Sequence, residues 1–203
     1  MNTPVSRAPS GPLHIDRLGL ERLSTSGAVT GLIGMTHCPG RSGPDGAGRA
    51  WQRNVERDVA AIRAAGFDTV LTLVDDAELA RLGAAGLPAR LQQAGIDGLR
   101  FPIADFGVPD GRALQAWAGI QAELLARLQR GRSVLVHCAA GLGRTGTMVA
   151  TLLTALGDSA DTAIARVRAA RPGTIETEAQ ARFVHDQAAS RPTTSATAET
   201  PGG

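Results

Sequence analysis

The segment HCAAGLGRTG, residues 137–146, combines a nucleophilic side chain with a backbone suited to binding an anion. Cys138 follows an apolar run that predicts a strand, and Gly141 and Gly143 let the next loop adopt left-handed backbone conformations. Such a loop can turn successive N–H groups inward as an anion-binding nest. Arg144 then opens an apolar helix, so a guanidinium and the positive helix end face the same point. This arrangement predicts a site in which a tetrahedral oxyanion lies against the sulfur.

The positive field of this loop also acts on the cysteine. The thiolate is the nucleophilic form, and a helix N-terminus with a nearby cation favours it. Thr145 follows the loop, where its hydroxyl can donate to the sulfur, and His137 is expected to orient the loop through ring hydrogen bonds. The expected phosphate-binding groups belong to Ala139, Ala140, Gly141, Leu142, Gly143 and Arg144.

Phosphoryl transfer to sulfur leaves an alkoxide or phenoxide that needs a proton, so a carboxylic acid on a movable loop is expected. The segment FPIADFGVPDG, Phe101–Gly111, lies between a predicted strand and a predicted helix, and its Asp105 is the best candidate for this acid. Asp110 stands where a helix N-cap is needed, so its expected role is structural, with acid catalysis as the alternative. Since His137 and Cys138 have no second pair at metal-ligand spacing, neither a metal nor a cofactor is expected.

A second His-Cys pair, in HCPGR at residues 37–41, resembles the first one. Its arginine follows Cys38 too closely to ring a phosphate. We interpret Cys38 as a loop thiol near the site, with a reversible disulfide to Cys138 under oxidation as an alternative.

Two aspartates and two tryptophans also carry alternative interpretations. Asp75 and Asp76 follow a buried predicted strand, and helix capping is favoured over acid catalysis for both. Trp51 and Trp117 lie on apolar faces of predicted helices, which favours core packing over a role as substrate platforms.

Short β-rich segments alternate with helical ones along the chain. The patterns predict strands over 28–35, 67–74, 98–103 and 133–138, and helices over 49–66, 76–82, 87–94, 110–129, 144–156, 160–171 and 176–189. This alternation predicts an α/β fold with a central, mostly parallel sheet flanked by helices, whose ligand sites lie at the carboxyl ends of strands. One domain is expected over 13–189, between flexible tails at 1–12 and 190–203.

Composition narrows the function classes. The net charge of the 203 residues is +2, which does not predict nucleic-acid binding. No apolar stretch approaches the ~20 residues that span a bilayer, and the N-terminus lacks a signal-peptide pattern, so a cytoplasmic monomer independent of membranes is expected. All 21 basic residues are arginine, and with abundant alanine and glycine this indicates GC-rich coding and favours a bacterial source.

The segment HCAAGLGRTG, residues 137–146, resembles a known signature. The pattern H-C-x5-R-[ST]-G of cysteine-dependent protein tyrosine and dual-specificity phosphatases is met by His137, Cys138, Arg144, Thr145 and Gly146. With PIADFGVPD, RNVERDV and GTIETEAQARFV, residues 33–185 resemble the cyclin-dependent kinase inhibitor 3 type, also called the kinase-associated phosphatase type. The resemblance implies a protein tyrosine phosphatase-like (dual-specificity) fold and phosphomonoester hydrolysis through phosphocysteine, with Asp105 as general acid and base.

Two further points follow from the resemblance. A glutamine matching Gln180 positions the hydrolytic water in many tyrosine phosphatases, less consistently in dual-specificity members, and the alternative is a polar residue on a solvated helix face. The segment Gly43–Gly48 resembles an insertion, and the loop after Cys38 is glycine-rich. Because substrate choice depends on such surfaces, a cyclin-dependent kinase is not carried over as the target.

The substrate class stays open at this stage. With no tyrosine in the chain, a shallow cleft that accepts phosphotyrosine and phosphoserine or phosphothreonine in proteins is favoured, and small-molecule or lipid phosphomonoesters are the alternative. Two rivals are a rhodanese-like sulfurtransferase and a non-catalytic phosphoprotein-binding module. The first needs neither Asp105 nor the Arg-Thr-Gly ending, and the second usually loses the cysteine, arginine or acid.

Overall fold

The computed structural model describes residues 11–20, 31–46 and 48–190. The predicted tails lie almost entirely outside these ranges, as does the first part of the strand predicted over 28–35. In the described part of the chain, no helix is both long and apolar enough to cross a membrane.

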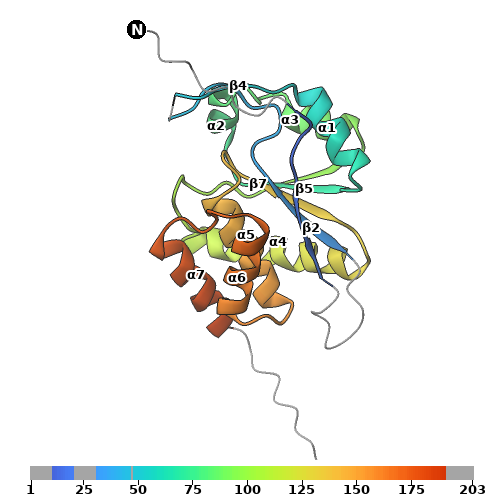
Figure 1. Ribbon diagram of the computed structural model, residues 1–203. Helices are drawn as coiled ribbons and strands as arrows, with labels where there is room; N and C mark the ends of the chain where they lie inside the picture. Colours follow the sequence, from blue (N-terminus) through green and yellow to red (C-terminus); the bar gives the residue numbers. More distant parts are fainter. Residues whose placement is uncertain (1–10, 21–30, 47, 191–203) are drawn as a thin grey trace, which may run out of the picture.

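A five-stranded sheet forms the centre of the molecule (Figure 1). Its strands lie in the order β1, β2, β7, β5, β6, with the bounds Asp16–Gly19, Leu32–Thr36, Val134–His137, Thr69–Thr72 and Asp97–Arg100. Strands β2, β7, β5 and β6 run parallel to one another, and β1 pairs antiparallel with β2 at the edge. The predicted mostly parallel sheet is therefore confirmed. Because β7 is the central strand, the loop after it opens at the middle of the carboxyl edge of the sheet.

Helices cover both faces of the sheet (Figure 1). On one side lie α1, α2 and α3, with the bounds Val55–Ala64, Asp76–Arg81 and Leu87–Gln93. On the other lie α4, α5, α6 and α7, with the bounds Gly111–Gln129, Gly143–Ala155, Ala160–Ala170 and Glu178–Ala189. Apart from the helix predicted over 49–66, the predicted helices are confirmed within a few residues of their ends.

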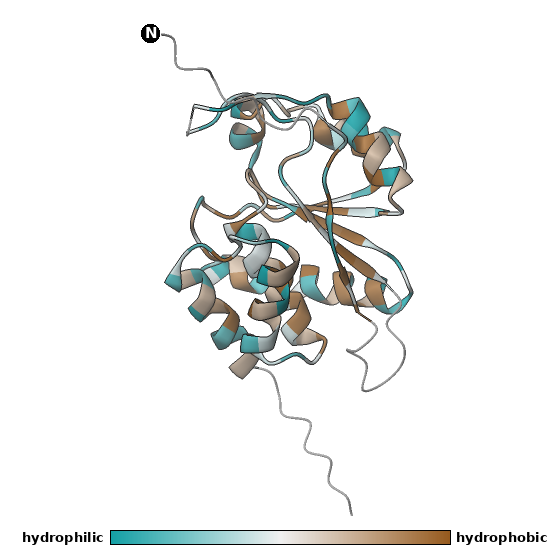
Figure 2. Cartoon of the chain, viewed as in Figure 1, coloured by the Kyte–Doolittle hydropathy of each residue, from teal (hydrophilic) through white to brown (hydrophobic). Residues whose placement is uncertain are grey.

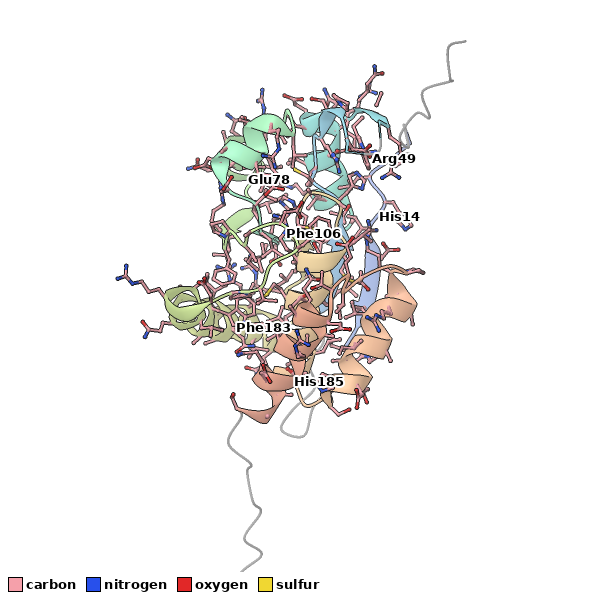
Figure 3. The ribbon with its side chains drawn as sticks, turned by 90° about the vertical axis from the view of Figure 1, so that its left-hand side faces the viewer. His14, Arg49, Glu78, Phe106, Phe183 and His185 are labelled. Carbon is pink, nitrogen blue, oxygen red and sulfur yellow. The ribbon has the colours of Figure 1, made fainter. Side chains whose placement is uncertain are left out.

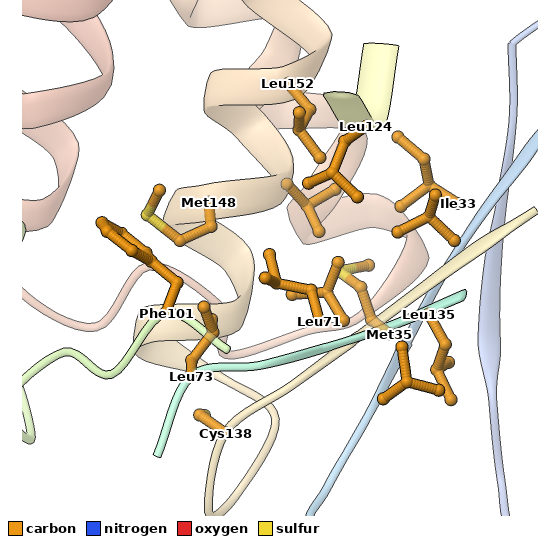
Figure 4. Close-up of a cluster of buried hydrophobic side chains, with 14 of the residues drawn as sticks. Ile33, Met35, Leu71, Leu73, Phe101, Leu124, Leu135, Cys138, Met148 and Leu152 are labelled. Atoms are coloured by element: carbon orange, nitrogen blue, oxygen red, sulfur yellow. The ribbon is translucent and has the colours of Figure 1, made fainter. Parts of the chain in front are cut away.

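Apolar side chains concentrate on the strands and on the helix faces toward them (Figure 2). The inner strands β5 and β7 are buried on both faces, as expected for a parallel sheet covered by two helical layers. Figure 4 shows the cluster between the sheet and the helices α4 and α5, with Cys138 at its rim and with contributions from Ile33, Met35, Leu71, Leu124, Met148 and Leu152. The cysteine is thus held by the rigid core and not by a free loop.

The helix predicted over 49–66 is wrong in its first part. It begins only at Val55, after the N-cap Asn54, whose side chain accepts a hydrogen bond from the backbone N–H of Arg57. Upstream, β4 (Ala50–Gln52) pairs antiparallel with β3 (Ser42–Pro44) in a two-stranded sheet. Trp51 therefore lies on a strand instead of a helix, although it is buried as predicted. The extended Asn54 interrupts a helical spacing that the sequence alone continues.

Candidate active site

Cys138 lies at the carboxyl end of β7, directly before the loop that opens α5. Its Sγ is buried and accepts a hydrogen bond from the backbone N–H of Gly141 at 3.2 Å. Gly141 has φ +74°, and a Cβ at this position would lie 2.3 Å from the carbonyl oxygen of Thr36. Only glycine fits this turn, because a side chain would collide with the backbone of Thr36. Glycine at this position therefore allows the N–H of Gly141 to lie against the sulfur.

Two arginines outside the loop hold its carbonyl groups. Arg171 donates from Nε to the oxygen of Gly141 at 2.6 Å and from Nη2 to that of Ala140 at 3.0 Å. Arg41 donates from Nη1 to the oxygen of Ala139 at 3.1 Å. With three successive carbonyls bound from outside, the peptide dipoles point their positive ends into the site. The sequence analysis missed Arg171, since no local pattern connects the end of α6 with this loop.

Arg144 is buried at the start of α5 and is held by a carboxylate that the sequence analysis did not single out. Its Nη1 and Nη2 donate to Oε2 and Oε1 of Glu78 on α2, both at 2.8 Å, and Nη1 also donates to the carbonyl of Ile103 at 3.0 Å. Although burial lowers the pKa of Arg144, the hydrogen bonds with Glu78 and the nearby Cys138 raise it above its usual value. The guanidinium is thus a permanent positive charge in one orientation.

Asp105 lies on the loop between β6 and α4, and its Oδ1 is 2.9 Å from Nη2 of Arg144. Its side chain is 59% exposed, so the carboxyl group combines a fixed contact with access to a bound ligand. Asp110 occupies the N-cap position of α4 without a side-chain capping bond and lies outside the pocket around Cys138. Of the two candidate acids, the structure brings only Asp105 to the site.

The predicted catalytic side chains of Cys138, Arg144 and Asp105 share one open pocket of about 290 Å³. The lining comes from the loop that follows Cys138 (the cysteine loop), the loop between β6 and α4 that carries Asp105 (the acid loop), one residue before α7, and the β3–β4 hairpin with the residue before it. The lining residues are Cys138, Ala139, Ala140, Arg144, Asp105, Phe106, Glu176, Arg41, Asp45, Gly46 and Arg49. Figure 3 shows Glu78, Phe106 and Arg49 in the same half of the molecule, away from Phe183 and His185. The pocket lies at the carboxyl edge of the sheet, as predicted.

His137 makes the contacts that an orienting role requires. Its Nδ1 lies 3.2 Å from the carbonyl oxygen of Cys138, and its Nε2 lies 2.9 Å from the hydroxyl of Thr72. Burial lowers the pKa of His137 to about 4, so the ring is neutral near pH 7. Because a carbonyl can only accept, Nδ1 carries the proton and Nε2 accepts from the threonine.

The buried histidines are expected to lower the free energy of unfolding in mild acid. Burial lowers the pKa of His137 to about 4 and that of His37 to about 3, from 6.5 in the unfolded chain. Between about pH 6.5 and 4 the unfolded state binds more protons, so stability falls as the pH falls, by up to about 1.4 kcal/mol per pH unit for each ring. Denaturant unfolding at several pH values should show a shallower slope for His37→Asn than for the unchanged protein. Identical slopes would contradict this assignment.

The hydroxyl of Thr145 does not make the predicted hydrogen bond to the sulfur. Its Oγ1 is buried inside the first turn of α5 and has no hydrogen-bond partner among the described residues. A buried hydroxyl without a partner is unfavourable. A contribution of Thr145 to the chemistry at Cys138 stays a prediction.

Gln180 is buried and caps α7. Its Oε1 accepts from the N–H groups of Glu176 and Thr177, which completes a capping box, and its Nε2 lies 3.5 Å from the carbonyl of Gly107 in the acid loop. Glu176 lines the pocket, and its Oε2 accepts from the N–H of Gly143 at 2.8 Å. The Gly143 amide, predicted to bind phosphate, therefore has a carboxylate partner that an incoming anion must replace.

The remaining sequence candidates do not line the pocket. Cys38 lies beside the loop after Cys138, as predicted, since its backbone N–H donates to the carbonyl of Ala139 at 3.1 Å. Burial raises the pKa of its thiol to about 12. Asp75 caps α2 by accepting from the N–H of Glu78 at 2.7 Å, as predicted, whereas Asp76 pairs with Arg100 at 2.7 Å. Trp117 is buried on α4, which confirms its predicted place in the core.

Comparison with known proteins supports the fold and the kind of site. The family model of Cyclin-dependent kinase inhibitor 3 (CDKN3) matches residues 2–165. Cyclin-dependent kinase inhibitor 3 of Homo sapiens is 32% identical over 178 residues, which cover 86% of this chain and 78% of the human protein. Protein tyrosine phosphatase domain-containing protein 1 of Mus musculus is 37% identical over 130 residues, 60% of this chain and 17% of that protein. Both relatives are mammalian, so the predicted bacterial source gains no support from them.

Solved structures give the same picture. Kinase associated phosphatase (KAP), crystallised with its catalytic site cysteine substituted by serine, has a TM-score of 0.77 and 30% identity over 90% of this chain and 99% of its own. Tk-PTP in its active form has a TM-score of 0.60 and 28% identity over 78% of this chain and 92% of its own. The predicted tyrosine phosphatase-like, dual-specificity fold is confirmed.

Proposed function

The chain belongs to the cyclin-dependent kinase inhibitor 3 (CDKN3) family and is a cysteine-dependent phosphatase, and from this premise we propose which of its residues perform the reaction and on what substrate. Cys138 is the nucleophile, Arg144 binds the phosphate, and Asp105 is the general acid and base. The observation that carries this assignment is the contact of Asp105 with Arg144 in the pocket that also holds Cys138.

In the first step, the sulfur of Cys138 forms a bond to the phosphorus of a bound monoester. The bond from phosphorus to the leaving oxygen breaks with its electron pair, and Asp105 donates the proton that this oxygen takes. Arg144 and the loop N–H groups stabilise the charge on the equatorial oxygens. Because Glu78 already fixes the guanidinium, Arg144 itself needs little reorganisation when the phosphate arrives, whereas Glu176 must release the N–H of Gly143.

In the second step, water hydrolyses the phosphocysteine. Asp105, now a carboxylate, takes a proton from the water as its oxygen bonds to phosphorus, and the breaking bond to sulfur restores the thiolate of Cys138. Inorganic phosphate then leaves the pocket. Neither step draws on a group beyond the side chains and amides described.

The proposed substrates are phosphorylated proteins, with phosphotyrosine and phosphoserine or phosphothreonine accepted alike. The openness of the pocket supports this breadth, since Asp105 and Phe106 at its rim are more than half exposed. KAP is by its name associated with a kinase, and its family relationship to this chain supports a protein substrate. Kinetic profiling with phosphopeptides and small phosphomonoesters tests the proposal. It predicts a higher kcat/KM for the phosphopeptides than for the small phosphomonoesters.

Asp105→Asn is expected to slow hydrolysis in proportion to the basicity of the leaving group. An asparagine cannot donate the proton, so alkyl phosphates should lose about 10²–10⁴-fold in kcat/KM, whereas p-nitrophenyl phosphate should lose far less. The measurement is kcat/KM across a series of leaving groups, with Asp110→Asn as the matched control. Equal losses for all leaving groups, or the same pattern in Asp110→Asn, would rule out Asp105 as the acid.

A further inference from the structure

The hairpin of β3 and β4 forms one wall of the catalytic pocket. Asp45, Gly46 and Arg49 line the pocket from the hairpin, together with Arg41, which directly precedes β3. The hairpin contains the segment Gly43–Gly48, which from its sequence resembles an insertion. This wall is therefore suited to selecting among substrates that share the same reacting group.

Arg49 is held in place and still presents free donors. Its backbone N–H and its Nε donate to the two carboxylate oxygens of Asp45, each at 2.8 Å. Asp45 also accepts from the indole N–H of Trp51 at 3.0 Å, and its side chain is only 5% exposed. The Arg49 side chain is 54% exposed, and neither of its Nη atoms has a hydrogen-bond partner within the described ranges. The guanidinium thus offers its outer edge to a ligand.

Arg41 adds a second positive charge to the same wall. Its guanidinium lies 4.5 Å from the ring centre of Trp51 and bonds the Ala139 carbonyl of the cysteine loop. Burial lowers the pKa of Arg41, although the attraction of Asp45 raises it. Two guanidinium groups face one carboxylate on this wall.

The other charged groups of the pocket already have partners. Asp105 contacts Arg144, and the carboxylate of Glu176 accepts from the N–H of Gly143. On the hairpin side alone, two arginines stand against the single carboxylate of Asp45, so the exposed edge of Arg49 is where a second anion can meet a positive charge.

We infer that the β3–β4 hairpin is a second anion-binding subsite, at which Arg49 binds a carboxylate side chain next to the phosphorylated residue of a peptide substrate; this rests on the proposed phosphatase function. A pocket of about 290 Å³ spans on the order of 7 Å, or about two residues of extended chain. The recognised aspartate or glutamate therefore stands one or two positions from the phosphorylated residue.

The test compares three phosphopeptides that differ only in the residues at these flanking positions, which are Asp, Asn or Lys. The unchanged protein should hydrolyse the Asp peptide with about 5- to 20-fold higher kcat/KM than the Asn peptide, and the Lys peptide slowest. Arg49→Gln should bring the Asp-to-Asn ratio close to one, Arg49→Glu should favour the Lys peptide, and Arg49→Lys should restore the preference for Asp. The preference of the unchanged protein should also shrink as salt is raised.

Arg182→Gln is the matched control, because Arg182 is an exposed arginine of α7 with its own carboxylate partner, Glu178. It should keep the Asp-to-Asn ratio of the unchanged protein. A ratio of one in the unchanged protein, or a ratio that survives in both Arg49→Gln and Arg49→Glu, overturns the subsite while leaving the phosphatase assignment intact. Failure to hydrolyse any of the three peptides overturns the proposed protein substrate and the subsite with it.

Discussion

Replacing Cys138 with serine is expected to lower kcat by about 10⁴–10⁶-fold while phosphate and vanadate still bind. The hydroxyl of serine is a far weaker nucleophile than a thiolate, whereas the loop amides and Arg144 that hold the anion are unchanged. Steady-state kinetics with p-nitrophenyl phosphate and calorimetric titration with vanadate measure the two properties separately. A loss of both together would show only that the loop had collapsed.

Cys38→Ser is the control for this substitution. It removes the other thiol of the chain, which lies beside the cysteine loop with its backbone N–H bonded to the carbonyl of Ala139. Turnover should stay within a few-fold of that of the unchanged protein. Near-normal activity in Cys138→Ser, or loss of activity in Cys38→Ser alone, would transfer the nucleophilic role away from Cys138.

Replacing Arg144 with lysine is expected to cost about 10³–10⁵-fold in kcat/KM and also to lower stability. A single ammonium cannot reproduce the paired hydrogen bonds to Glu78 and at the same time reach Asp105 and the Ile103 carbonyl. The buried carboxylate of Glu78 is left poorly paired, a defect that costs about 3–5 kcal/mol when a buried ion pair is broken. Kinetics and denaturant unfolding measure the two losses.

The double variant Glu78→Gln with Arg144→Lys separates stability from catalysis. Removing the unpaired carboxylate should recover much of the lost stability without recovering activity, because an ammonium still does not replace the guanidinium at the phosphate. Recovery of both would mean that Arg144 acts only by supporting the fold. Near-normal activity of Arg144→Lys alone would contradict its proposed role.

The sequence is most informative where the chemistry is contiguous. The strand end, the glycine turn and the arginine follow one another within residues 134–146, and each has a local physical signature, so the loop and its place on the sheet are predictable. Asp105 is predictable for the same reason, since its loop is bounded by a strand and a helix. The parallel sheet follows from runs of residues buried on both faces.

The groups that fix the loop from outside were not predictable. Glu78, Arg171 and Glu176 meet the site across contacts distant in sequence, and within their own segments they match ordinary helix or helix-end residues. The start of α1 was misplaced because Trp51 and Val55 keep a helical spacing through a turn that Asn54 interrupts. The hairpin strands β3 and β4, three residues each, are too short to produce an alternating pattern.

The central claim is that the phosphoryl group passes through the sulfur of Cys138. In the direct measurement, the Asp105→Asn variant is mixed with p-nitrophenyl phosphate, whose p-nitrophenolate leaving group needs no acid. The reaction is quenched within one turnover, and peptide mass spectrometry locates the added phosphate. The account predicts phosphate on the peptide that contains Cys138, on sulfur, and none when Cys138 is replaced by serine. Release of p-nitrophenol without a phosphorylated protein, or phosphate attached to any other side chain, would contradict it.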